Sequence, residues 1–143
     1  MKYLFLLFCS LFSATCFAQN FKLEYRSPQM LIMVHDQQII RIDTEFVYDA
    51  PASGVPSAAN TKERKITITA DQLAEIQRFV LRSGFINLGD AYGAKEYEKF
   101  SPYTLEVDWQ KIQKKVIFRS GQIADPRPQA FAELEKYVLE IAK

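Results

Sequence analysis

The stretch from Thr69 to Gly84 constrains the fold most, because it predicts a helix with a defined start, a defined end and one apolar face. Thr69 and Gln72 fit a capping box, in which two side chains satisfy free backbone N–H groups at a helix start. Apolar residues recur at helical spacing at Leu73, Ile76, Phe79 and Val80. Gly84 suits the left-handed conformation that ends many helices. A helix of this kind must bury its apolar face against another element.

Segments with the pattern of β-strands lie on both sides of this helix. Four are predicted before it: Phe21–Arg26, Met30–Val34, Ile39–Tyr48 and Ile66–Ile68. Two more follow it as a hairpin, Tyr103–Trp109 and Lys114–Arg119, and a second helix is predicted over Gln129–Ala142. Most of the strand segments alternate apolar and polar residues. The continuous apolar run 30–34 fits either a strand or a buried helical turn, and the loop-like residues 35–38 after it favour a strand.

Helices that follow strands without alternating one-for-one with them indicate the α+β class. We therefore predict an antiparallel sheet of about five or six strands with two helices packed on one face. The predicted order is strands, helix, hairpin, helix. Residues 19–143 contain no internal repeat and no linker long enough to divide them, so we expect a single α+β domain.

Residues 1–18 (MKYLFLLFCSLFSATCFA) have the three parts of a secretory signal peptide. Lys2 supplies a basic start, an apolar run follows, and small residues precede a predicted cut between Ala18 and Gln19. The run is shorter than the roughly 20 apolar residues that a membrane-spanning helix needs, so we expect cleavage and not a transmembrane anchor. The leader is typical of bacterial exported proteins, which predicts a periplasmic or extracellular location.

The leader also changes how the composition is interpreted. Both cysteines and one of the 18 basic residues lie in it, so residues 19–143 contain no cysteine, 17 basic and 17 acidic side chains, and one histidine. We therefore expect no thiol nucleophile, no disulfide and no metal site built on Cys or His. Equal numbers of basic and acidic side chains argue against nucleic-acid binding. These counts favour a protein without a cofactor that is not an enzyme.

Two pairs of residues have side chains that could take part in catalysis or metal binding. His35 and Asp36 have the residue types of a general base and its partner, but neighbours in a strand or turn tend to point apart. A polar hairpin tip explains this pair more simply. Asp43 and Glu45 would share one face of a regular strand, but calcium takes six to eight oxygen ligands, so a solvated strand face is the better interpretation. We predict neither a catalytic nor a metal-binding residue.

Two segments supply candidate contact residues. Asp49–Asn60 (DAPASGVPSAAN) is rich in proline and small residues, which predicts an exposed loop. Gly89–Phe100 (GDAYGAKEYEKF) is a polar connector with aromatic residues, which can form a platform for a sugar or a peptide. Inward packing of aromatic residues is the simpler alternative. The candidate ligand or partner contacts are Pro51, Pro56, Tyr92, Tyr97 and Phe100.

The segment Ile66–Leu73, then Phe85–Leu88 and Tyr92, then the hairpin and the closing helix resemble a group of small secreted bacterial α+β domains. That group includes domains of unknown function and the emfourin-type inhibitors of thermolysin-like metalloproteases. The resemblance extends over roughly Ile66 to Ile141 and involves mostly apolar core residues, so it implies a fold more than an activity. Those inhibitors carry a glycine-rich segment near the first strand, whereas Tyr25–Met30 contains no glycine. No binding residue is inferred from the resemblance.

These observations predict a secreted or periplasmic bacterial protein, most simply a non-catalytic interaction or inhibitor-like domain. Its expected partner is another envelope or secreted protein. The alternative is an envelope module that binds a small ligand such as a glycan or a peptide. The sequence specifies neither the partner nor the oligomeric state.

Overall fold

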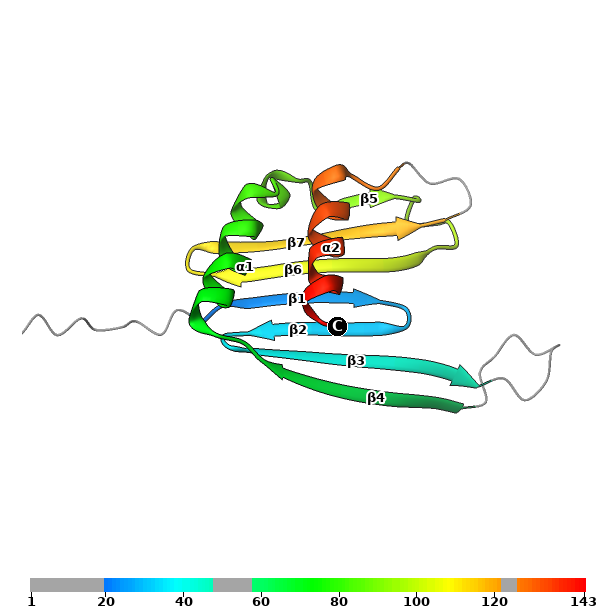
Figure 1. The fold of residues 1–143 in the computed structure, drawn as a ribbon. Helices are drawn as coiled ribbons and strands as arrows, with labels where there is room; N and C mark the ends of the chain where they lie inside the picture. Colours follow the sequence, from blue (N-terminus) through cyan, green and yellow to red (C-terminus); the bar gives the residue numbers. More distant parts are fainter. Residues whose placement is uncertain (1–19, 48–57, 122–125) are drawn as a thin grey trace, which may run out of the picture.

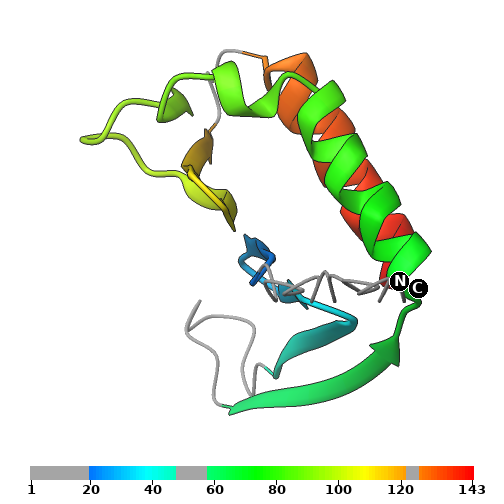
Figure 2. The same ribbon diagram turned by 90° about the vertical axis from the view of Figure 1, so that its left-hand side faces the viewer.

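A computed structural model describes residues 20–47, 58–121 and 126–143 of the chain. These residues form an α+β fold in which a seven-stranded sheet carries both α-helices on one face (Figure 1, Figure 2). In chain order the elements are β1 (Lys22–Ser27), β2 (Met30–His35), β3 (Gln38–Val47), β4 (Ala58–Thr67), α1 (Ala70–Arg82), the 3-10 helix η1 (Phe85–Asn87), β5 (Ala91–Gly93), β6 (Ser101–Trp109), β7 (Ile112–Ser120) and α2 (Gln129–Ile141). The strand order across the sheet is β4-β3-β2-β1-β6-β7-β5.

The capping predicted for α1 is confirmed. The Thr69 hydroxyl accepts a hydrogen bond from the backbone N–H of Gln72 at 3.2 Å, and the Gln72 side chain accepts one from the backbone N–H of Thr69 at 2.8 Å. Ser83 caps the other end, and Gly84 follows in the left-handed conformation with φ +76°. These two ends give the helix the bounds that its sequence predicts.

The sheet differs from the prediction in strand number and direction. It has seven strands, not five or six, because the predicted polar connector contains the three-residue strand β5. β5 pairs in parallel with β7, so the sheet is mixed and not purely antiparallel. The order is therefore strands, helix, short strand, hairpin, helix. Gly93 allows this pairing, since its φ is +88° and an added Cβ would lie 2.2 Å from the backbone oxygen of Arg119.

β4 is also much longer than the predicted strand over Ile66–Ile68. It begins at Ala58 and pairs with β3 over ten residue pairs, from Gln38↔Thr67 to Val47↔Ala58. Residues 58–60 of the predicted loop therefore belong to a strand, and residues 48–57 lie outside the described residues. The sequence of β4 lacks the alternation of apolar and polar residues that marks a strand. The reason is that one face of β4 is exposed and the other is only partly covered, so charged side chains are tolerated on both.

Both hairpin turns are tighter than the predicted four-residue loops. Two residues join β2 to β3, and Asp36 among them has φ +51°. Two residues likewise join β6 to β7, and Gln110 has φ +56°. Positive φ at a turn position matches the twist of antiparallel strands, which is why such short loops are favoured.

The core lies between the helix layer and the sheet. Its largest fully buried side chains come from the segment before β1, from β1–β3, from β6, and from the helical segments: Phe21, Leu23, Ile32, Ile39, Ile76, Phe85, Leu105, Phe131 and Leu134. Burying a side chain of this size stabilises a fold by about 1.5–3 kcal/mol. The rings of Phe79 and Tyr137 stack at 4.0 Å and so join α1 to α2.

A buried polar network ties α2 to the sheet. The Tyr25 hydroxyl donates to Glu135 at 2.7 Å, and Arg127 forms an ion pair with the same carboxylate. The Arg127 guanidinium also lies 4.6 Å from the ring centres of Tyr103 and Phe118. Burial, and then the bond to Glu135, raise the pKa of Tyr25 well above its usual value. The network therefore places one charged pair inside the helix–sheet interface.

Among the described residues, no helix is both long enough and apolar enough to cross a lipid bilayer.

Candidate functional site

The three aromatic residues predicted as contacts lie in different environments. Tyr92 packs against the core, and its hydroxyl accepts a hydrogen bond from the backbone N–H of Gly89 at 2.7 Å. The Phe100 ring lies 5.5 Å from the Arg119 guanidinium. Tyr97 is 79% exposed. Only Tyr97 therefore offers most of its ring to a ligand, whereas Tyr92 contributes to the fold.

The other predicted residues lie outside the described part of the chain. These are Pro51 and Pro56 in the predicted loop, and Ala18 and Gln19 at the predicted cleavage point. The strands that flank residues 48–57 are described, however, and they show where this segment joins the fold. It connects the last residue of β3, Val47, to the first residue of β4, Ala58.

The only histidine lies at a turn. The side-chain atoms His35 Nδ1 and Asp36 Oδ2 are 3.5 Å apart, and both side chains are about half exposed or more. The second Asp36 oxygen accepts a hydrogen bond from the backbone N–H of Phe21 at 3.1 Å. The contacts of Asp36 thus stabilise the β2–β3 turn, in agreement with a polar hairpin tip.

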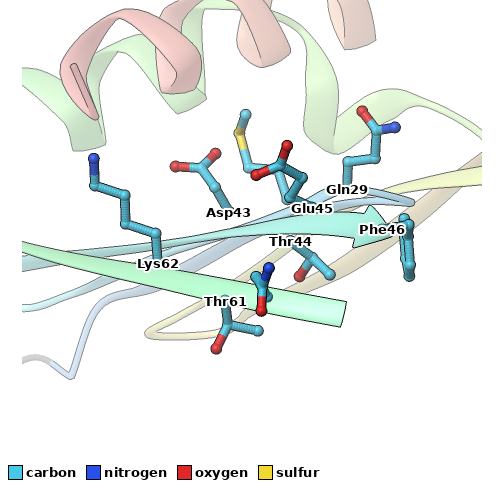
Figure 3. A pocket seen from close by; sticks show the side chains of 9 residues that line it. Gln29, Asp43, Thr44, Glu45, Phe46, Thr61 and Lys62 are labelled. Atoms are coloured by element: carbon cyan, nitrogen blue, oxygen red, sulfur yellow. The ribbon is translucent and has the colours of Figure 1, made fainter. Parts of the chain in front are cut away.

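A hollow of about 480 Å³ lies at the β3–β4 end of the sheet, next to the strand ends that lead into residues 48–57 (Figure 3). Its lining comes from the β1–β2 turn, the start of β2, β3 and β4: Gln29, Met30, Asp43, Thr44, Glu45, Phe46, Asn60, Thr61 and Lys62. Figure 3 shows Asp43, Glu45 and Lys62 pointing to the helix side of the sheet, and Thr44 and Thr61 pointing to the other side. We call this feature the β3–β4 hollow.

Pairing between β3 and β4 determines which groups face the β3–β4 hollow. The register places Asp43 opposite Lys62 and Glu45 opposite Asn60. Asp43 is held by Arg41, whose Nε lies 2.9 Å from one carboxylate oxygen and whose second nitrogen lies 3.0 Å from the other. Asp43 and Glu45 therefore do share a face, but one of the two carboxylates already has a cation.

Glu45 and Lys62 are the charged groups that the β3–β4 hollow leaves available. Both are exposed, and within the described residues neither has an ion-pair partner. Together with the amides of Gln29 and Asn60 they offer one negative charge, one positive charge and several hydrogen-bond donors and acceptors. No group of three or more metal-ligating side chains occurs in the described part of the chain. Such a surface can bind a polar partner through charge pairs and hydrogen bonds.

The sequence points to this site only in part. The shared face of Asp43 and Glu45 follows from strand alternation, but Lys62 and Asn60 come next to them only through the β3–β4 register. Their segment lacks the apolar alternation that marks a strand.

Comparisons of the chain with protein-family models, with curated proteins and with solved structures found no match.

Proposed function

We propose that this chain is an exported bacterial interaction or inhibitor-like domain that binds another envelope or secreted protein through the β3–β4 hollow and the adjoining segment 48–57. The observation that carries the proposal is the position of the hollow, next to the strand ends that lead into residues 48–57, a stretch rich in proline and small residues. Loops held by a rigid sheet are common contact elements in proteins.

The charges of the hollow also support a protein partner. Glu45 and Lys62 are solvated side chains of opposite sign, and the polar rim of a protein interface consists of such groups. Phe46 also lines the hollow, and its partly buried side chain points to the face of β3 opposite Glu45 (Figure 3). Aromatic residues are enriched in interfaces, because they add contact area at low entropy cost.

The first experiment identifies the partner and locates the contact. The exported protein is used to capture binding proteins from an envelope extract, and captured proteins are identified by mass spectrometry and titrated by calorimetry. Glu45→Lys and Lys62→Glu should each weaken binding by about tenfold, which corresponds to about 1.4 kcal/mol. Glu133→Lys is the matched control, because Glu133 is exposed on α2 in the other layer.

A second experiment tests the inhibitor-like form of the proposal. Peptide hydrolysis by a thermolysin-like metalloprotease is measured with increasing amounts of the exported protein, and then with the Glu45→Lys variant. Inhibition that the variant weakens would support an inhibitor. Deletion of residues 51–59 that leaves every partner bound, together with charge reversals that change no affinity, would refute the proposed contact site.

A further inference from the structure

The face of the sheet opposite the helices carries a compact aliphatic surface. On β2 and β3 the side chains that alternate with the buried core residues are Leu31, Met33, Ile40 and Ile42, which we call the aliphatic block. The register pairs Leu31 with Ile42 and Met33 with Ile40, so the four side chains form two adjacent cross-strand pairs. Each is partly exposed, and none belongs to the residues packed against the core.

No element of the described residues covers this block. Both helices lie on the other side of the sheet (Figure 2). Cross-strand aliphatic neighbours on an exposed sheet face are costly to leave in water, because burying apolar surface is favourable. The aliphatic block is therefore a candidate contact surface that is separate from the β3–β4 hollow.

An ion pair borders the block on each side. On β4, Lys65 Nζ lies 3.1 Å from the Glu63 carboxylate. On β1, the Arg26 guanidinium lies 2.8 Å from the Glu24 carboxylate. Partial burial acts in the opposite direction, but Arg26 and Lys22 lower the pKa of Glu24 below its usual value, so this carboxylate is charged at neutral pH.

The strand register fixes the order of these charges around the block. One row across the sheet reads Lys65, Ile40, Met33, Glu24, and the next row reads Glu63, Ile42, Leu31, Arg26. The corners are therefore positive and negative in the first row, and negative and positive in the second. Opposite charges alternate around the four corners of an apolar rectangle.

This arrangement is complementary to itself. A two-fold axis in the plane of contact and parallel to the strands places Lys65 of one copy opposite Glu24 of the other, and Glu63 opposite Arg26. An axis across the strands places Lys65 opposite Glu63 and Glu24 opposite Arg26. In both cases each corner meets its opposite charge while the two aliphatic blocks meet at the centre. Interfaces of two-fold dimers are self-complementary in this way.

From the charge order and the uncovered aliphatic block we infer that two copies of this chain associate face to face through the open side of the sheet. Stacked sheets pack at about 10 Å with their strands within about 30° of alignment, which keeps both corner pairings possible. With the axis across the strands, the six strands from β4 to β7 overlap and span about 29 Å at about 4.8 Å per strand, over a common length of about 20 Å. The two copies together then bury roughly 1,200 Å², near the lower end for specific interfaces, so the dimer is weak. With the axis parallel to the strands, only β4, β3, β2 and β1 overlap, and the buried area falls to roughly 800 Å². The larger area belongs to the axis across the strands.

Sedimentation equilibrium of the exported protein tests the inference. The expected mass rises from one chain to two, with a dissociation constant of roughly 10–100 μM for so small an interface. Met33→Glu places a charge in the centre of the block and should leave a monomer at every concentration. Leu81→Glu is the matched control, because Leu81 is a 46% exposed apolar residue on α1, and it should not change the mass. Thermal melting shows whether each variant is folded.

Charge exchange tests the corners without touching the block. Lys65→Glu should raise the dissociation constant about tenfold, because two exposed pairs change from attraction to repulsion. Adding Glu24→Lys restores the dimer if the axis is parallel to the strands, and adding Glu63→Lys restores it if the axis runs across them. A protein that stays monomeric, a dimer that Met33→Glu and Lys65→Glu leave unchanged, or a loss that neither second substitution reverses overturns the inference.

Discussion

Replacing Arg127 by methionine should cost about 3–5 kcal/mol of unfolding free energy, because it leaves a buried carboxylate without its cation. Glu135 is 7% exposed, and its carboxylate bonds only to Tyr25 and Arg127 among the described residues. Methionine keeps much of the apolar contact with the rings of Tyr103 and Phe118. What it loses there is the cation–π attraction, which contributes about 0.5–1 kcal/mol for each ring. The uncompensated charge of Glu135 accounts for most of the effect.

Stability should return when the whole network is made apolar. Combining Tyr25→Phe, Arg127→Met and Glu135→Leu replaces the whole network with apolar residues. It removes all three polar side chains of the network at once. Such replacements are often neutral or stabilising, because no charge has to be desolvated. The triple variant should therefore be closer to the original protein in stability than Arg127→Met alone.

Urea unfolding at pH 7, followed by the fluorescence of Trp109, measures these differences. Trp109 is the only tryptophan and is 8% exposed, so its emission reports the loss of the core. For a domain of this size, 3–5 kcal/mol corresponds to a fall of roughly 10–20 °C in Tm. A cost below about 1 kcal/mol for Arg127→Met, or a triple variant that is no more stable than the single one, would refute the account of this network.

Three further substitutions test separate parts of the fold. Tyr25→Phe should cost about 1.5–3 kcal/mol at pH 7, because the hydroxyl donates to the Glu135 carboxylate. Because the pKa of Tyr25 is raised in the folded protein, the unfolded chain loses the phenol proton at a lower pH than the folded one. The stabilisation by the Tyr25 hydroxyl is therefore complete below about pH 10 and is lost as the pH rises further. Urea titrations above about pH 10 should show the stabilities of the original protein and of Tyr25→Phe converging. Thr69→Ala removes the capping hydroxyl of α1 and should lower the unfolding free energy by about 1 kcal/mol in the same titration, while an unchanged midpoint would refute the cap. Gly93→Ala brings a Cβ against the Arg119 carbonyl oxygen at a positive φ and should cost at least about 1–3 kcal/mol, seen as faster amide exchange in β5; unchanged exchange would show that the β5–β7 contact is not needed.

Strong local signals account for the parts of the fold that the sequence predicts well. The Thr69–Gln72 capping box and Gly84 bound α1 by hydrogen bonds within a few residues, and these form whatever the rest of the chain does. The alternating segment in β6 likewise carries its own pattern of buried residues. Helix ends and half-buried strands are therefore visible without knowledge of tertiary contacts.

The missed elements depend on partners far along the chain. β4 has exposed residues at most of its positions, four of them charged, and only its pairing with β3 makes it a strand. β5 has three residues and exists because β7 lies beside it, with Gly93 removing the steric obstacle. The β3–β4 hollow and the charge order around the aliphatic block are consequences of register, which sequence periodicity does not specify.

Crosslinking in the living cell tests most directly whether the β3–β4 hollow contacts a partner protein. A photoreactive phenylalanine analogue is placed at position 45, in the hollow, and at position 133, on α2, and intact cells are irradiated before the envelope fraction is analysed. We expect a crosslink between position 45 and another envelope or secreted protein, and no such product at position 133. No product at position 45, or the same products at both positions, would contradict it.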